Sequence, residues 1–200
     1  MSKPSKYQVQ DFSKLKDLNG IPNNQIEIHL GLYEGYVKNV NLLNQKIYDL
    51  AQDNKIDQPE YAELKRRLGF EYGGMVLHEL YFQNLDPNRE SHHPIQKKLD
   101  TLWGTYEKWE KEFTTMGTMR GIGWVVLYFD PSSGNLHNHW ITLHDENVIP
   151  GFIPLLVMDV WEHAFMAYRK PSEKEKYVKD FISNIKWQTV QDRFDKHDPY

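Results

Sequence analysis

Two kinds of side chain in this sequence are suited to binding a metal ion: an aspartate that ends an apolar segment, and histidines. Residues 153–159 read IPLLVMD, so Asp159 follows an apolar run, and His163 lies four residues later. A carboxylate in an apolar setting is costly unless it is paired or metal-bound. If the chain turns helical here, the D-x-x-x-H spacing brings a carboxylate oxygen and an imidazole nitrogen together. Taken alone, the pair is more typical of a helix-capping aspartate and a hydrogen-bonded core histidine.

Two further histidines lie on the apolar stripes of a predicted helical hairpin. Apolar residues recur every three or four positions over residues 24–85, with a polar break near Lys55, which predicts two long antiparallel helices. Counted from Lys55, His29 lies 26 residues before the turn and His78 lies 23 residues after it. This difference of three residues is about 4.5 Å along the helix axes. We therefore expect both histidines at nearly the same height, near the open end of the hairpin.

Together with the aspartate–histidine pair, these two side chains make a set of three imidazoles and one carboxylate. Such a set suits iron or manganese and leaves a position for solvent. A lone histidine on an apolar stripe is usually a hydrogen-bonded core residue. The metal hypothesis therefore depends on two helices delivering two histidines to one height.

The second half of the chain predicts a smaller unit of mixed structure. Three segments read as strands, at residues 123–130, 135–144 and 153–159, with a short PSSG turn between the first two. Helical patterns cover residues 95–113 and begin again at residues 161–169. Ser172 and Glu175 have the spacing of a capping box for a last helix that reaches Trp187.

We therefore expect an α+β fold in two parts. Residues 1–88 are predicted to form an N-terminal domain, with an irregular arm over residues 1–22 followed by the long antiparallel helical hairpin. Residues 89–200 are predicted to form a C-terminal α/β domain, in which helices flank a three-stranded antiparallel sheet.

Composition narrows the classes of function. The sequence has no cysteine, which excludes disulfides, thiolate metal sites and iron–sulfur clusters. With 24 basic and 28 acidic residues, the net charge of −4 gives no general attraction to nucleic acid. The mean hydropathy of −0.71 and the lack of long apolar runs predict no membrane span. The N-terminal segment lacks the apolar core of a secretory signal, so we expect a cytoplasmic protein.

The stretch PLLVMDVWEHAF, residues 154–165, resembles the DVWEHAY signature of the iron/manganese superoxide dismutases. Four other stretches resemble parts of that family in the same order. They match its first metal-binding helix, its second metal-binding helix, its Gly-Trp strand and hairpin, and its C-terminal helix. In this chain they read HLGLYEGYVKNVN (29–41), GMVLHELYFQNL (74–85), GIGWVVLYFDPSSGNL (121–136) and DFISNIKWQTV (180–190).

This resemblance implies a superoxide dismutase that converts superoxide to oxygen and hydrogen peroxide. It implies one iron or manganese ion per subunit, in a homodimer or homotetramer. The implied metal ligands are His29, His78, Asp159 and His163, and the implied pocket aromatics are Tyr36, Trp124 and Trp161. Glu162 matches the family's glutamate that reaches across to the ligand histidine of a partner subunit.

The chain departs from the family pattern where that pattern guides the solvent bound to the metal. The family places a glutamine either four residues before the second ligand, which here is Gly74, or after the hairpin strand. This chain has no glutamine at either place, and His144 is the best substitute. We expect one ring nitrogen of His144 to face the metal-bound solvent and the other to be fixed by a neighbour such as Tyr36. The alternative is an ordinary loop histidine. The family's two gateway histidines are also absent, since residues 32–34 read LYE.

Two other classes of protein are alternatives to this one. A carboxylate-bridged di-iron protein needs Glu-x-x-His on two helices. Only Glu90 and His93 have that spacing, in a predicted loop. The other class is a metal-binding protein on the same fold that has lost turnover along with the glutamine and the gateway residues. Assays of activity and metal content would separate it from an enzyme.

Overall fold

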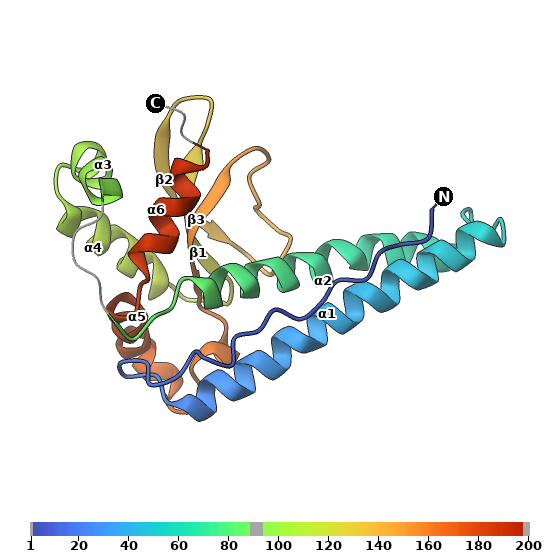
Figure 1. The fold of residues 1–200 in the computed structure, drawn as a ribbon, viewed down its shortest axis with the longest axis horizontal. Coiled ribbons are helices and arrows are strands. Elements are labelled where there is room, and N and C mark those ends of the chain that lie inside the picture. Colours follow the sequence, from blue (N-terminus) through green and yellow to red (C-terminus); the bar gives the residue numbers. More distant parts are fainter. Residues whose placement is uncertain (1, 89–93, 198–200) are drawn as a thin grey trace.

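The N-terminal half of the molecule is a long antiparallel pair of helices. In the computed structural model, which describes residues 2–88 and 94–197, α1 (Asn23–Gln52) and α2 (Pro59–Gln83) pack along each other (Figure 1). The 30 residues of α1 span about 45 Å, so the hairpin extends well beyond the sheet. Pro59 occupies the first turn of α2, where its missing N–H breaks no helical hydrogen bond.

The arm that precedes α1 has no regular structure, as the sequence predicted, and it runs along the hairpin (Figure 1). The backbone N–H of Tyr7 donates to Asn41 Oδ1 at 2.8 Å. The backbone N–H of Gln10 donates to the hydroxyl oxygen of Tyr33 at 2.9 Å. These bonds attach the arm to α1 at two separate heights.

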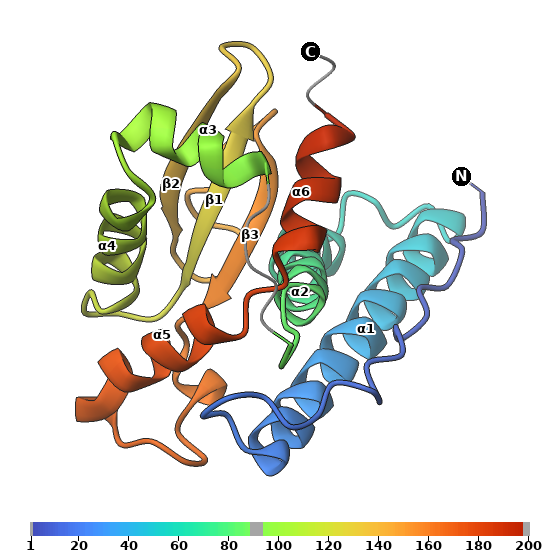
Figure 2. The same cartoon turned by 60° about the vertical axis from the view of Figure 1, so that its left-hand side comes forward.

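The C-terminal half contains a three-stranded antiparallel sheet. Its strands are β1 (Trp124–Asp130), β2 (Asn135–Ile141) and β3 (Ile153–Asp159), in the order β2–β1–β3. Helices α3 (Pro94–Trp103) and α4 (Tyr106–Gly117) pack on this sheet, while α2 and α6 (Trp187–Asp195) contact β3 (Figure 2). The predicted α+β class and the antiparallel sheet are therefore confirmed.

The helical segment predicted over residues 95–113 is two helices. Gly104 adopts φ +87°, a backbone conformation that ends α3 and that side-chain-bearing residues rarely adopt. Thr105 then starts α4, because its side chain accepts a hydrogen bond from the backbone N–H of Lys108.

Two predictions about the C-terminal helices were also wrong. Residues 161–169 do not begin an α-helix, since only a single 3₁₀ turn, Glu162–Ala164, forms there. The last predicted helix is also divided. A 3₁₀ turn (Pro171–Glu173) leads into α5 (Lys174–Ser183), and the chain then turns before α6. The capping contact joins Glu173 to the backbone N–H of Lys170, two residues earlier than the predicted Ser172–Glu175 box.

The strand register decides which end of the sheet meets the helical hairpin. Trp124, the first residue of β1, pairs with Ile141 at the end of β2 and with Asp159 at the end of β3. These three residues therefore lie side by side at one end of the sheet, across its three strands. The predicted boundary between residues 88 and 89 falls beside residues 89–93, outside the described part, and stays a prediction. In the described ranges, no helix has the length and apolar character needed to cross a membrane.

Candidate metal centre

Four side chains from both halves of the molecule meet at one point. His29 comes from α1, His78 from α2, Asp159 from the end of β3, and His163 from the 3₁₀ turn that follows. Each offers one nitrogen or oxygen atom, and these atoms lie within 4.8 Å of one another. The two helical histidines are at one height, as counting from the turn predicted, with ring centroids 5.0 Å apart.

The Oδ2 atom of Asp159 is the centre of this cluster. It lies 3.0 Å from His29 Nε2, 3.0 Å from His163 Nε2 and 3.8 Å from His78 Nε2. All three imidazoles therefore present the same nitrogen to the carboxylate. The side chains of His29, His78 and Asp159 are almost fully buried, whereas that of His163 is 21% exposed.

The hydrogen bonding of His78 shows that the cluster has the chemistry of a metal site. Its Nδ1 lies 2.6 Å from the carbonyl oxygen of Gly74, so Nδ1 carries the proton and donates it. The lone pair of Nε2 then points into the cluster, and among the described residues this buried atom has no hydrogen-bond partner. A buried acceptor without a donor is costly. A cation at this point would satisfy it together with the carboxylate, as iron or manganese does with nitrogen and oxygen ligands.

Burial and mutual proximity set the charges of the cluster. Burial raises the pKa of Asp159, but the charge and hydrogen bonds of His163 and His29 more than offset it, leaving the pKa below its usual range. Burial lowers the pKa of His78 well below that of a free histidine, and the neighbouring His29 lowers it further. The pKa of His29 is lowered mainly by burial. Two imidazoles are thus kept neutral and the carboxylate charged, which is the protonation state of ligands.

Three residues that sequence reasoning missed hold these ligands in place. Gln25 is fully buried in α1, where its Nε2 donates to the carbonyl oxygen of His163 at 2.7 Å. Its Oε1 accepts from the backbone N–H of Ala167, so one amide joins α1 to the ligand loop. The Tyr177 hydroxyl donates to the carbonyl oxygen of Asp159 at 2.6 Å. The ring of Tyr81, the third of these residues, packs on His29 with centroids 5.0 Å apart.

The predicted pocket aromatics surround the cluster. The Trp124 ring lies edge-on to His78, with centroids 5.0 Å apart. Trp161 stacks beside His163 at 5.7 Å, and its backbone N–H donates to Asp159 Oδ1 at 2.8 Å. That bond fixes the carboxylate so that Oδ2 faces the histidines. Glu162 is exposed on the surface of this chain.

His144 is buried beside the cluster, between two of these aromatic residues. The indole N–H of Trp124 donates to His144 Nδ1 at 3.1 Å. His144 Nε2 lies 2.7 Å from the Tyr36 hydroxyl. Burial is the main reason that the pKa of His144 is lowered to about 4, so the ring is neutral near pH 7. Since Nδ1 accepts, the single proton is on Nε2 and is donated to Tyr36.

This arrangement leaves neither nitrogen of His144 for a metal-bound solvent. Tyr36 was predicted as a neighbour of His144, and the hydrogen bond confirms it. The second partner, Trp124, was not predicted. The direct contact with solvent that the sequence suggested is therefore not available to His144, whose Nε2 is bonded to the Tyr36 hydroxyl instead.

Two glycines in α2 explain why the helix carries no glutamine here. A Cβ on Gly74 would lie 2.6 Å from Tyr36 Cδ1, and one on Gly73 would lie 2.2 Å from the carbonyl oxygen of His144. Both distances are too short for real atoms, so the Tyr36 ring and the His144 loop occupy space that side chains would need. Leu143 adopts φ +55°, a conformation uncommon for a residue with a side chain. The loop thus turns sharply just before His144.

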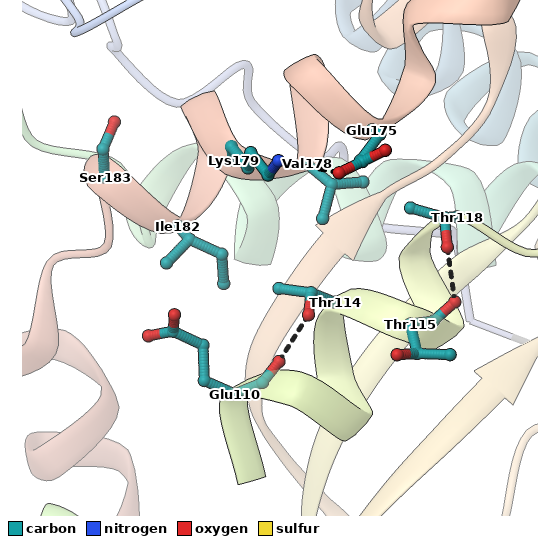
Figure 3. Close-up of a pocket in the computed structure, with 9 residues that line it drawn as sticks. All are labelled: Glu110, Thr114, Thr115, Thr118, Glu175, Val178, Lys179, Ile182 and Ser183. Carbon is teal, nitrogen blue, oxygen red and sulfur yellow. Dashed lines mark hydrogen bonds and ion pairs between the residues drawn. The ribbon is translucent and has the colours of Figure 1, made fainter. Parts of the chain in front are cut away.

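Within residues 2–88 and 94–197, no other group of side chains forms a comparable centre. A groove of about 420 Å³ separates α4 from α5 and shares no lining residue with the cluster (Figure 3). Its Thr114 and Thr118 hydroxyls donate to carbonyl oxygens of α4 itself. Glu90 and His93, the pair considered for a di-iron site, lie outside the described residues.

Comparisons with known proteins agree with this geometry. A family model described as iron/manganese superoxide dismutases, C-terminal domain, matches residues 91–193. An iron superoxide dismutase from Aquifex pyrophilus is 36% identical over 198 residues, covering 96% of this chain and 92% of the relative. A manganese superoxide dismutase from Mycolicibacterium smegmatis is 33% identical, covering 80% of this chain and 77% of the relative. An iron enzyme from Methanothermobacter thermautotrophicus is 33% identical over 88% of this chain and 87% of its own length.

Proposed function

Because the chain belongs to the iron/manganese superoxide dismutase family, we propose that it converts superoxide to oxygen and hydrogen peroxide. The proposed site holds one iron or manganese ion, and its ligands are His29, His78, Asp159 and His163. The observation that carries the proposal is the buried Nε2 of His78, which faces the carboxylate of Asp159 with no donor among the described residues.

An ion bound here supplies a one-electron cycle, so that one superoxide is oxidised to oxygen and a second, with two protons, is reduced to hydrogen peroxide. The protein must keep the ion in place and deliver protons without a costly change of charge in a buried site. The Asp159 carboxylate raises the pKa of His163 despite its burial, so a bound ion would have to displace a proton from this ring. One carboxylate and three neutral imidazoles would then contribute a charge of −1, which partly balances the cation. The ligands come from both halves of the molecule, so binding the ion ties these halves together.

We assign proton delivery to Tyr36 and its positioning to His144. Burial raises the pKa of Tyr36 to about 12, so the hydroxyl keeps its proton at neutral pH. The Tyr36 oxygen accepts a hydrogen bond from His144 Nε2–H, so the Tyr36 O–H remains free to donate. The Tyr36 ring lies 5.0 Å from that of His78, so this O–H can donate toward the cluster. Trp124 sets this direction by donating to the opposite nitrogen of His144.

The remaining assignments rest on composition and on the family resemblance. Trp124 and Trp161 form apolar walls that exclude water from the ligands. Exposed Glu162 is free to reach a partner subunit, which supports a homodimer or homotetramer. A cytoplasmic location, and the division into domains at residues 88 and 89, complete the proposal.

The test is to prepare the protein with iron and with manganese, and to measure metal content and superoxide dismutation on each form. We expect one ion per chain and activity in at least one form. His163→Ala should lose both the bound metal and the dismutation activity. The control His137→Ala removes an exposed histidine of β2 and should keep both. One bound ion per chain with no dismutation in either form would favour the metal-binding protein without turnover.

A further inference from the structure

Arg67 lies on the solvent side of the Tyr36–His144 pair. The Arg67 guanidinium carbon lies 4.2 Å from the centre of the Phe70 ring. The Phe70 ring in turn lies 4.5 Å from His144 and 6.4 Å from Tyr36. Arg67 is exposed, Phe70 and Tyr36 are half-buried, and His144 is buried. These side chains thus form a series from the surface toward the ligand His78.

Arg67 belongs to an ion pair whose two charges face opposite directions. Its Nε donates to Glu71 Oε1 at 2.7 Å, and Asn39 donates to the other carboxylate oxygen at 3.2 Å. The Arg67 side chain is 56% exposed, whereas that of Glu71 is 4% exposed. The pair therefore presents its positive end to solvent and keeps its negative end inside.

The field of this pair reaches the groups beside the cluster. Burial has the largest effect on the pKa of Tyr36, and after Asp159, Glu71 raises this pKa while Arg67 lowers it. Arg67 also lowers the pKa of His144, after burial and His163. Because the whole chain carries a net charge of −4, no general attraction draws an anion to it. Any attraction must be local.

We propose that Arg67 steers superoxide, a small monovalent anion, along the Phe70 ring toward the Tyr36–His144 pair, and that Glu71 opposes this attraction. The inference rests on the proposed function, because it concerns the approach of that substrate. In water, a unit charge about 10 Å from an approaching anion changes the local concentration of that anion by about twofold. Salt screens this effect.

The experiment compares Arg67→Gln, Glu71→Gln and the control Arg66→Gln with the wild type. Arg66 is the next residue of the same helix, is exposed, and pairs with exposed Glu63. At low ionic strength, Arg67→Gln should lower kcat/KM about twofold and Glu71→Gln should raise it about twofold. Arg66→Gln should change it less than either, and all differences should vanish at about 1 M salt, where the Debye length is about 3 Å.

A second readout does not depend on turnover. Azide, a small monovalent anion, is titrated into the metal-loaded proteins and followed by absorption, and its affinity should change in the same directions. A wild type that binds metal but does not dismutate superoxide would sink the proposed function, and the azide titration would still decide the role of Arg67. The steering role would be overturned if Arg67→Gln and Glu71→Gln lowered kcat/KM and azide affinity equally at every salt concentration, or if neither variant changed them.

Discussion

Acid should destabilise the folded protein through His144 in particular. The pKa of this histidine is lowered to about 4, mainly because the ring is buried, with 1% of the residue exposed. In the unfolded chain its pKa is about 6.5. As the pH falls, the unfolded state therefore binds the proton first. The stability contributed by neutral His144 is complete above about pH 6.5 and is lost as the pH falls toward 4.

The expected loss can be worked from the two pKa values. Between about pH 7 and about pH 5, this residue alone should remove about 2 kcal/mol from the free energy of unfolding. His144→Gln lacks the titrating group, while its amide can still accept from Trp124 and donate to Tyr36. Urea unfolding of the metal-loaded wild type and variant at each pH gives the free energy of unfolding as a function of pH for both proteins. The control His137→Gln removes an exposed histidine and should follow the wild type.

A His144→Gln variant that loses as much stability as the wild type over this pH range would refute the reasoning. It would mean that the ring is already charged in the folded state, or that it can leave its buried position. Either result would also remove the argument that His144 Nε2 donates to Tyr36.

Three other changes test separate parts of the account. Gly74→Ala should lower the free energy of unfolding in urea by about 1–3 kcal/mol and also lower the dismutation rate, because the new methyl group would lie 2.6 Å from the Tyr36 ring. The control is Gly31→Ala, which has open space around it and should not lower the free energy of unfolding. Tyr177→Phe should lower stability by about 1 kcal/mol and speed metal release to a chelator, since the carbonyl oxygen of Asp159 loses its donor; an unchanged release rate would contradict this. Removing the metal should lower the melting temperature, and an unchanged value would show that the ion does not couple the two halves.

The sequence predicted those parts of the site that depend on local periodicity. The hairpin follows from apolar spacing, and residue counting placed His29 and His78 at one height because both helices are regular over their whole length. The aspartate at the end of an apolar strand is a similar local signal. These local patterns therefore singled out His29, His78 and Asp159 without any knowledge of long-range packing.

Contacts between distant segments were beyond local patterns. Gln25 bonds to residues about 140 positions away, and only its place on an apolar helix face could have drawn attention to it. Tyr177 and Trp124 reach the site through the packing of α5 and the sheet, which composition does not reveal.

The helix predicted to start at residue 161 shows a different limit. The pattern WEHAFMAYR suits a helix, yet the Gln25 side chain accepts from the backbone N–H of Ala167 and donates to the carbonyl oxygen of His163, the two groups that would bond to each other in an α-helix. Those tertiary bonds replace the helical ones, so only a 3₁₀ turn remains. Local propensity favoured a helix, but the ligand geometry determined the conformation.

The central claim is that one metal ion sits between His29, His78, Asp159 and His163. Anomalous diffraction from crystals of the iron- or manganese-loaded protein tests it most directly. We expect one peak per chain, about 2 Å from the Nε2 atom of each histidine and from one carboxylate oxygen of Asp159. A peak at any other place, or full metal content with no peak inside this cluster, would contradict it.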